Sequence, residues 1–262
     1  MKKIRTGTLK TMKDSGEKFS ALTSYDALTA EIFDEAGIEV LLVGDSAGNV
    51  VLGHSTTVPV TLEEMIPFGR AVAGAAKSAL VVVDLPFGSY EISPEQALES
   101  SIKIMKTTGA DAVKLEGLKV AQVAALVASG IPVMGHLGFT PQSVNQLSGF
   151  RVQGRGDAAE KLMDEAKQLE AAGVFAIVLE MVPAALASEI SKTLSIPTIG
   201  IGAGAGCDGQ ILVWTDMAGL GAKSPSFAKK FADLRGELVK AALTYRSEVS
   251  SGAFPESSRD FS

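Results

Sequence analysis

Seven residues that could take part in acid–base or metal chemistry stand in or directly after short apolar runs of the sequence. They are Asp45, Ser46, Asp84, Lys114, Glu116, His136 and Glu180. Asp45, Asp84 and Glu116 are hard oxygen donors, and like charges held close together are most simply explained by a bound cation. Mg²⁺ prefers such ligands, whereas zinc usually binds histidine or thiolate. The sequence therefore predicts a site for Mg²⁺ or a similar ion. The alternative is that each acid only caps the turn after its strand.

Lys114, His136 and Glu180 could supply the remaining chemistry. The ammonium of Lys114 interrupts an apolar run and could bind a substrate carboxylate or stabilise developing negative charge. A salt bridge from Lys114 to Glu116 or another acid is the alternative. His136 is a candidate active-site group, although a lone histidine can equally hydrogen-bond a nearby loop. Glu180 follows the apolar run VFAIVL and is a candidate general base, with an ion pair to Lys114 as the alternative.

A glycine-rich segment, GIGAGAG at residues 200–206, follows a further apolar run. It lacks the complete P-loop pattern and the context of a dinucleotide-binding fold. Phosphate binding and a tight turn that admits a bulky ligand are both compatible with it. The segment by itself does not decide between them.

A repeated unit of the chain explains how these residues could meet. A helical stretch ends on a small residue and glycine, a short aliphatic run follows, and a polar residue ends that run, as in DEAGIEVLLVGDS and EAAGVFAIVLEM. Glycine suits the position just past a helix end, and the aliphatic run suits a strand buried on both faces. Eight strands are predicted on this template, at about residues 18–25, 40–45, 80–85, 111–116, 131–136, 174–180, 197–202 and 210–215.

Alternation of strands and helices predicts parallel strands with right-handed crossovers. Eight strands favour an α/β fold of the closed (β/α)8 TIM barrel type over an open doubly wound sheet. An N-terminal extension precedes the first strand, and a C-terminal helix is expected at about residues 227–249. Active-site residues of such barrels lie at the carboxyl ends of the strands, where the seven residues fall. Lys114 and Glu116 are two positions apart in one strand, so their side chains share a face.

Composition narrows the classes of protein. The 262 residues fit one barrel domain, residues 1–262, because barrels reach this size without splitting. The net charge of −6, without a basic stripe, argues against a nucleic-acid partner. No apolar stretch is long enough to span a bilayer, and the basic start of the chain is not followed by an apolar run, so we expect neither a membrane anchor nor a secretory signal. The single cysteine, Cys207, fits a reducing cytoplasm.

Motifs along nearly the whole chain resemble those of the ketopantoate hydroxymethyltransferase family. In order they are TSYD, LLVGDSAGNVVLGH, TTVPVT, DLPFGSY, AVKLEG, PVMGHLGFTPQSVN, VQGR, VLEMVP, IPTIGIGAG, CDGQILVWTD and PSFAKKF. The resemblance implies a barrel enzyme of pantothenate and coenzyme A biosynthesis with one Mg²⁺ per subunit. Such enzymes transfer a hydroxymethyl group from the co-substrate 5,10-methylenetetrahydrofolate to 3-methyl-2-oxobutanoate, giving 2-dehydropantoate through a Mg²⁺-stabilised enolate. The family is commonly homodecameric, so a homo-oligomer, a decamer, is expected.

The same resemblance implies a role for each matching residue. Asp45 and Asp84 fall where the family ligates the metal, and Glu116 falls at a further acidic position of the metal site. Glu180 matches the proton acceptor. The implied substrate-binding set is Asp45, Ser46, Asp84, Lys114 and His136, with the particular role of His136 left open. One alternative is another Mg²⁺-dependent 2-oxo-acid lyase or phosphonomutase on a similar barrel. The other is a barrel kept only as a binding protein, against which the intact acidic, lysine and histidine positions argue.

Overall fold

The computed structural model describes residues 2–147, 149 and 151–256. Contacts divide the chain into two compact units, Met1–Val213 and Trp214–Ser262. The single domain expected for residues 1–262 stays a prediction. The candidate site residues all belong to the first unit.

This first unit is a closed barrel of eight parallel strands in chain order. The strands are β1 Phe19–Thr23, β2 Val40–Val43, β3 Leu80–Asp84, β4 Ala112–Lys114, β5 Val133–Gly138, β6 Ala176–Glu180, β7 Thr198–Ile201 and β8 Gly209–Leu212. β8 pairs with β1, with Gly209 opposite Phe19, and this pairing closes the sheet. The predicted (β/α)8 barrel is confirmed, and the open doubly wound sheet is wrong.

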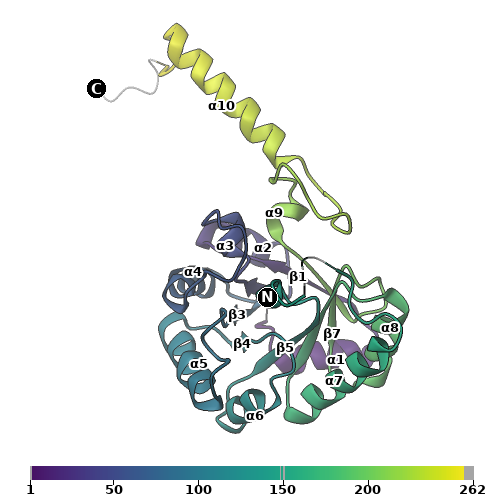
Figure 1. The fold of residues 1–262 in the computed structure, drawn as a ribbon. Coiled ribbons are helices and arrows are strands. Elements are labelled where there is room, and N and C mark those ends of the chain that lie inside the picture. The colour runs from purple at the N-terminus through teal and green to yellow at the C-terminus, as the bar shows by residue number, and fades with distance from the viewer. Residues whose placement is uncertain (1, 148, 150, 257–262) are drawn as a thin grey trace. The chain divides into compact units, whose positions relative to one another are not determined.

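Helices between the strands surround the barrel (Figure 1). They are α2 Ala27–Glu35, α3 Ala47–Val50, α4 Leu62–Ala75, α5 Pro94–Thr108, α6 Val120–Ala128, α7 Ala158–Ala172 and α8 Ala184–Thr193, with a 3₁₀ turn, η1, at Pro141–Ser143. Their ends follow local sequence, as α5 illustrates. Ser93 Oγ accepts a hydrogen bond from the Gln96 N–H at 3.2 Å before the first turn, and Gly109 takes a φ of 80° after the last.

Several strand ends differ from those predicted, and three of these differences concern site residues. β2 ends at Val43, so Asp45 lies in the turn after the strand rather than at its end. β4 ends at Lys114, so Glu116 lies in the loop beyond the strand. β5 continues to Gly138, so His136 lies within the strand rather than at its end. The cause is pairing: β5 follows β6 as far as the position where Gly138 stands opposite Glu180. The length of an apolar run does not predict where β5 ends, because the last residues of β5 are in a strand only through their pairing with β6.

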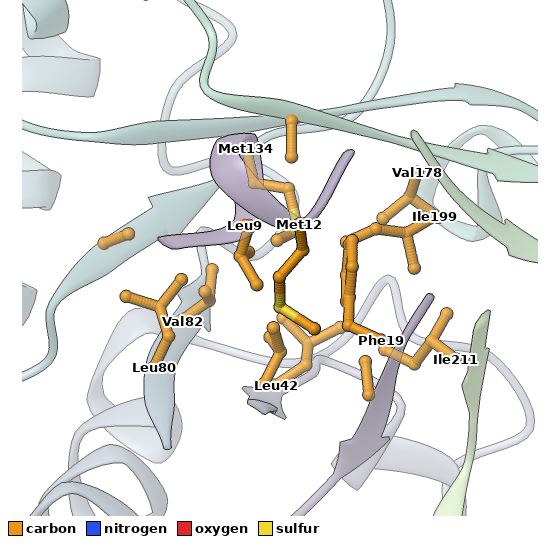
Figure 2. Packing of buried hydrophobic residues seen from close by; sticks show 14 residues of the cluster. Leu9, Met12, Phe19, Leu42, Leu80, Val82, Met134, Val178, Ile199 and Ile211 are labelled. Carbon is orange, nitrogen blue, oxygen red and sulfur yellow. The ribbon is translucent and has the colours of Figure 1, made fainter. Parts of the chain in front are cut away.

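The extension before β1 forms helix α1, Thr6–Ser15, which packs at the amino-terminal end of the barrel. Leu9 and Met12 are its buried residues. Figure 2 shows them among strand side chains of the barrel interior, including Phe19 and Leu42. Apolar packing therefore fills this end of the barrel, and the polar chemistry lies at the carboxyl ends of the strands.

Two ion pairs fasten the N-terminal extension to residues that precede strands. Lys3 Nζ lies 2.7 Å from Asp111 Oδ2, just before β4. Lys13 Nζ lies 2.8 Å from Asp208 Oδ2, just before β8. The extension is thus held by charge as well as by apolar contact.

A buried acid in the outer layer holds the residues that lead into β3. Asp34 of α2 accepts hydrogen bonds from three successive backbone N–H groups, those of Lys77, Ser78 and Ala79, at 3.0, 2.9 and 2.6 Å. Burial alone would raise the pKa of Asp34, but these donors outweigh it and the pKa lies below its usual value of 3.8. The ionised form is therefore the one that stabilises the fold.

We expect Asp34→Ala to lower the free energy of unfolding by about 2–4 kcal/mol at pH 7, because it leaves two buried backbone donors and one partly buried donor unpaired. Since the pKa is depressed on folding, this contribution is present above pH 3.8 and is lost as the pH falls through the folded-state value. Urea unfolding of both proteins at pH 7 and pH 3 measures it. Asp164→Ala, at an exposed position of α7, serves as control. An equal stability gap at the two pH values would contradict the assignment.

The second unit contains α9, Trp214–Met217, and α10, Leu234–Ser251. No residue of α10 is buried, and its exposed apolar side chains are Leu238, Val239, Leu243, Tyr245 and Val249. The predicted C-terminal helix is confirmed, although it begins at Leu234 rather than near residue 227. Within the described part of the chain, none of the helices combines the length and apolar character needed to cross a membrane.

Candidate active site

The seven predicted residues lie around the carboxyl ends of β2 to β6, and contacts connect them into one group. Asp84, Lys114 and Glu180 are the last residues of their strands. Apart from Ser46 and Glu180, the members of the group are buried. The group that the barrel brings together is Asp45, Ser46, Asp84, Lys114, Glu116, His136 and Glu180.

Asp84 and Lys114 form a buried ion pair. They stand opposite each other in the ladder of β3 and β4, and Lys114 Nζ lies 2.5 Å from Asp84 Oδ1. Burial lowers the pKa of Lys114, but the nearby carboxylates, Asp84 foremost, more than offset it and the net pKa is raised. The ammonium therefore stays charged. Of the ion pairs considered for Lys114, the one present is with Asp84.

Two contacts hold the turn after β2, one from its backbone to Asp84 and one from a side chain to Tyr25. The Asp45 N–H donates to Asp84 Oδ2 at 3.1 Å, and Ser46 Oγ lies 2.8 Å from Tyr25 Oη. A Cβ at position 44 would stand 2.8 Å from Ser46 Oγ and 3.4 Å from Asp84 Oδ2. The contact with Ser46 is too short and the contact with Asp84 is an ordinary van der Waals distance, so a side chain at Gly44 would displace the Ser46 hydroxyl.

The Asp45 carboxylate lies in an excess of buried negative charge. It is 3% exposed, and its Oδ2 accepts a hydrogen bond from Gln142 Nε2 at 2.9 Å. Burial, followed by the charges of Glu116 and Asp84, raises the pKa of Asp45 to about 8. Lys114 opposes this effect without cancelling it. The ionised form of Asp45 is thus disfavoured until a further positive charge is present.

The donor set fits a divalent cation, but its carboxylates do not already converge as a three-ligand cage. In residues 2–147, 149 and 151–256, no group of three or more His, Cys, Asp or Glu side chains is arranged to hold a metal ion. Asp84 contacts the backbone of Asp45, whereas the two oxygens of Glu116 face the Gln142 N–H and His136. Buried carboxylates without a full complement of positive partners are costly, and a cation would remove that cost. Glu116 as a metal ligand stays a prediction.

His136 lies between two carboxylates. Its Nδ1 is 3.3 Å from Glu116 Oε1 and its Nε2 is 3.3 Å from Glu180 Oε2. Within the described chain neither ring nitrogen meets the geometry of a hydrogen bond. Burial lowers the pKa of His136, but the carboxylates on either side outweigh it and raise the pKa to about 9. A cationic ring therefore joins Glu116 to Glu180, and Glu180 pairs with His136 instead of Lys114.

Three residues of the site are missing from the sequence prediction: Tyr25, Tyr90 and Gln142. Tyr90 Oη donates to Gln142 Oε1 at 2.5 Å and accepts from the Glu116 N–H at 3.3 Å. All three lie outside the strands, where alternation and aliphatic runs give no signal. Their only sequence signal is membership of the motifs TSYD, DLPFGSY and GFTPQSVN.

Two unusual backbone positions fix Glu180. Gly138, its partner in the ladder, has a φ of 92°, and a Cβ there would lie 2.2 Å from the Glu180 carbonyl oxygen. The Phe139 N–H donates to that oxygen at 2.8 Å. Met181 has a φ of 48°, which among the described residues is the one positive φ outside glycine. Such strain is kept where the surrounding structure requires it, here directly beside the candidate base.

Gly138→Ala is expected to slow any step that uses Glu180 by at least about tenfold, because the new methyl group displaces β6, the strand that carries Glu180. A stability loss of about 1–3 kcal/mol should accompany it. The measurement is the rate of proton exchange at carbon 3 of 3-methyl-2-oxobutanoate in D₂O, set beside a thermal melt. Gly130→Ala is the matched control, because Gly130 has a φ of 79° but open space around its Cβ. Equal exchange rates in the two variants would show that Gly138 does not position Glu180.

Packing explains glycines of the 200–206 segment. A Cβ at Gly204 would lie 2.5 Å from Ala184 Cβ, and one at Gly206 would lie 2.6 Å from Ser188 Cβ. Both contacts are with α8. Close approach to this helix therefore accounts for these two glycines, which favours the tight turn over a phosphate site.

Comparisons with a family model and with named relatives point to the same family over nearly the whole chain. The family model described as ketopantoate hydroxymethyltransferase matches residues 3–257. A 3-methyl-2-oxobutanoate hydroxymethyltransferase from Mycobacterium avium is 60% identical over 256 residues, covering 97% of this chain and 90% of the relative. A relative of the same name from Leifsonia xyli subsp. xyli is 56% identical over 263 residues, covering 99% of this chain and 95% of the relative. A solved phosphonopyruvate hydrolase in complex with oxalate and Mg²⁺ covers 99% of this chain and 92% of its own, with a TM-score of 0.63 and 12% identity, a likeness of fold alone.

Proposed function

The chain belongs to the ketopantoate hydroxymethyltransferase family, and from this premise we propose how its site serves the transfer of a hydroxymethyl group to 3-methyl-2-oxobutanoate. Identity to the named relatives over nearly the full chain is the observation that carries this activity. The enzyme is a transferase of pantothenate biosynthesis. The alternative, another 2-oxo-acid lyase or phosphonomutase, is not favoured, because the phosphonopyruvate hydrolase shares only the fold.

We infer that Asp45 and Asp84 hold a divalent cation, Mg²⁺, one per subunit, with Glu116 as a further candidate ligand. The support is the surplus of buried carboxylate at this end of the barrel and the raised pKa of Asp45. When bound, such an ion supplies an electrophilic partner for the oxygens of a 2-oxo acid. The choice of Mg²⁺ follows from a donor set made of carboxylates.

Ser46 and Lys114 bind the anionic end of the substrate in this proposal. Lys114 keeps its charge despite its burial, and its ammonium has donors beyond the one directed at Asp84. Ser46 Oγ is held by Tyr25 Oη, which fixes the hydroxyl beside Asp45. The substrate-binding set is completed by Asp45, Asp84 and His136.

Glu180 is proposed as the general base. Its side chain is 14% exposed whereas that of His136 is 3% exposed, so the carboxylate of Glu180 is the part of this pair that substrate can reach. The bond between carbon 3 and its hydrogen breaks, the proton passes to a Glu180 oxygen, and the electron pair enters the enolate. Water converts the methylene of the folate to formaldehyde, and tetrahydrofolate leaves. Carbon 3 of the enolate then forms a bond to the formaldehyde carbon, and the new alkoxide takes up the proton to become the hydroxymethyl group. A positioned base of this kind typically contributes about 10²–10⁴-fold in rate.

The one-carbon donor is proposed to be 5,10-methylenetetrahydrofolate, on the strength of family membership. We also propose a homo-oligomer, a decamer, located in the cytoplasm. The exposed apolar side chains of α10 support an oligomer, because a helix without buried residues is usually covered by a partner. The lone buried cysteine is compatible with a reducing compartment.

One experiment tests the proposal as a whole. Purified enzyme is incubated with 3-methyl-2-oxobutanoate and 5,10-methylenetetrahydrofolate, with Mg²⁺ or with EDTA, and the new hydroxymethyl protons are followed by NMR. Product that requires both the folate and the metal supports the proposal. Product formed equally in EDTA rules out the metal role. In a parallel incubation with phosphonopyruvate, cleavage of that compound together with no hydroxymethyl transfer in the first incubation would restore the alternative.

A further inference from the structure

Gln142 reaches two buried acids that follow different strands. It lies in η1, after β5, and is 5% exposed. Its backbone N–H donates to Glu116 Oε2 at 3.0 Å, and its side-chain Nε2 donates to Asp45 Oδ2 at 2.9 Å. Asp45 follows β2 and Glu116 follows β4, so β3 lies between their strands. One residue therefore connects two acids that the sheet does not connect.

The orientation of the Gln142 amide is determined by its neighbours. Nε2 also donates to the Leu85 carbonyl oxygen at 3.0 Å, so it faces one carbonyl and one carboxylate oxygen. A carbonyl can only accept, so the amide NH₂ must point to this side. The amide oxygen then faces Tyr90 Oη, which donates to it and accepts from the Glu116 N–H. Both amide hydrogens and the amide oxygen of Gln142 are in use, and no other orientation satisfies these partners.

We propose that Gln142 is a positioning residue that sets the Asp45 carboxylate relative to Glu116 and prepares this part of the site for its cation. Gln142 acts through the two acids. The inference rests on the metal role proposed above for Asp45. Two buried carboxylates that lie near each other repel when both are ionised, and a hydrogen-bond donor to each lowers that repulsion while fixing where each oxygen lies. Metal and catalytic sites lose much of their function when the residues that orient their ligands leave those ligands displaced by about 1 Å.

The test replaces the amide without opening a cavity. Gln142→Met keeps chain length and approximate volume, and removes both donors and the acceptor of the side chain. Mn²⁺ binding in the absence of substrate is titrated by EPR, and kcat and KM for hydroxymethyl transfer are measured separately. We expect the Mn²⁺ dissociation constant to rise about 10- to 100-fold, the usual effect of losing a group that orients a metal ligand. The thermal midpoint of the metal-free variant should stay close to that of the metal-free parent enzyme.

Two further variants make the result specific. Gln122→Met is the matched control, because among the described residues the hydrogen bond of Gln122 Nε2 is to the Tyr90 carbonyl oxygen, at 3.4 Å, and not to an acid. It should bind Mn²⁺ within about twofold of the parent enzyme. Tyr90→Phe removes the donor that holds the amide oxygen, and it should weaken Mn²⁺ binding in the same direction by a smaller factor. Combined with Gln142→Met it should add almost nothing, because both act on one network.

The outcomes separate this inference from the proposed function. Mn²⁺ affinity and turnover of Gln142→Met within twofold of the parent would overturn it. So would a lower thermal midpoint with normal affinity and normal turnover per folded molecule, which would make Gln142 purely structural. If the parent enzyme itself fails to bind Mn²⁺, the metal role of Asp45 fails. In that case the turnover of the variants tests the role of Gln142. A loss of turnover in Gln142→Met and Tyr90→Phe, but not in Gln122→Met, supports Gln142 as a positioning residue. Unchanged turnover in all three variants contradicts that role.

Discussion

Glu180→Gln is expected to reduce proton exchange at carbon 3 of 3-methyl-2-oxobutanoate by about 10²–10⁴-fold, because an amide cannot accept the proton that a carboxylate base removes. The variant keeps the size of the side chain and its place beside His136 Nε2, which lies 3.3 Å away. Substrate affinity should therefore change far less than turnover. Exchange is followed by NMR in D₂O with Mg²⁺ present and the folate absent, which isolates the proton-transfer step.

Glu160→Gln is the control for this result. Glu160 lies in the first turn of α7 on the exposed surface, so the same chemical change there should leave exchange unchanged. Exchange by Glu180→Gln at more than about one-tenth of the parent rate would remove Glu180 as the base. His136 would then be the group to replace next, since both acids of this part of the site face it.

The second large effect is expected for Asp45→Asn. This change should abolish the Mg²⁺-dependent rise in thermal midpoint and lower kcat/KM at least about 100-fold, because a bound metal is worth several kcal/mol of charge stabilisation. The stability of the metal-free protein should not fall. The buried Asp45 carboxylate is disfavoured by its surroundings, and an asparagine oxygen can still accept from Gln142 Nε2. Thermal melts with and without Mg²⁺, together with kinetics, measure both quantities.

Asp84→Asn is the contrasting variant. It also removes a proposed metal ligand, but it leaves the buried Lys114 ammonium without its ion-pair partner. Breaking such a pair typically costs about 3–5 kcal/mol, so this variant should be destabilised even without metal. If both variants lose stability alike, the Asp45 carboxylate is part of the structural network, and its assignment to the cation is wrong.

Much of the barrel was predictable because its signals are local. Each aliphatic run predicts a strand buried on both faces, and glycine after a helix predicts where the next run begins. Asp84 and Glu180 end their strands as expected, so their place at one rim followed from topology alone. The partner of Lys114 did not follow, because it depends on which residue of β3 stands opposite it in the ladder. Register between strands is a property of the assembled sheet.

The residues that orient the site side chains were less predictable from the sequence than the site residues themselves. Tyr90 lies in a loop and Gln142 in the 3₁₀ turn η1, and neither residue type has a strong preference that distinguishes a site segment from any other connecting segment. Their value comes from the directions of their donors, which only coordinates give. The extent of β5 is a similar case, since Gly138 joins the strand by pairing with Glu180. Charge and periodicity locate the reacting groups, whereas the residues that orient them are found through contacts.

Closure of the barrel by β1 and β8 also bears on how the chain folds during synthesis. β1 gains its second neighbour only when Gly209 meets Phe19, whose ring leaves no room for a Cβ at that glycine. At usual rates of translation, about 190 residues must follow β1, which takes on the order of 10–40 s. Throughout that interval one edge of β1 and the interior residues around it lack their final cover. Nascent chains halted before β8 should therefore recruit chaperones or aggregate, and release of the last strand from the ribosome should end that vulnerability.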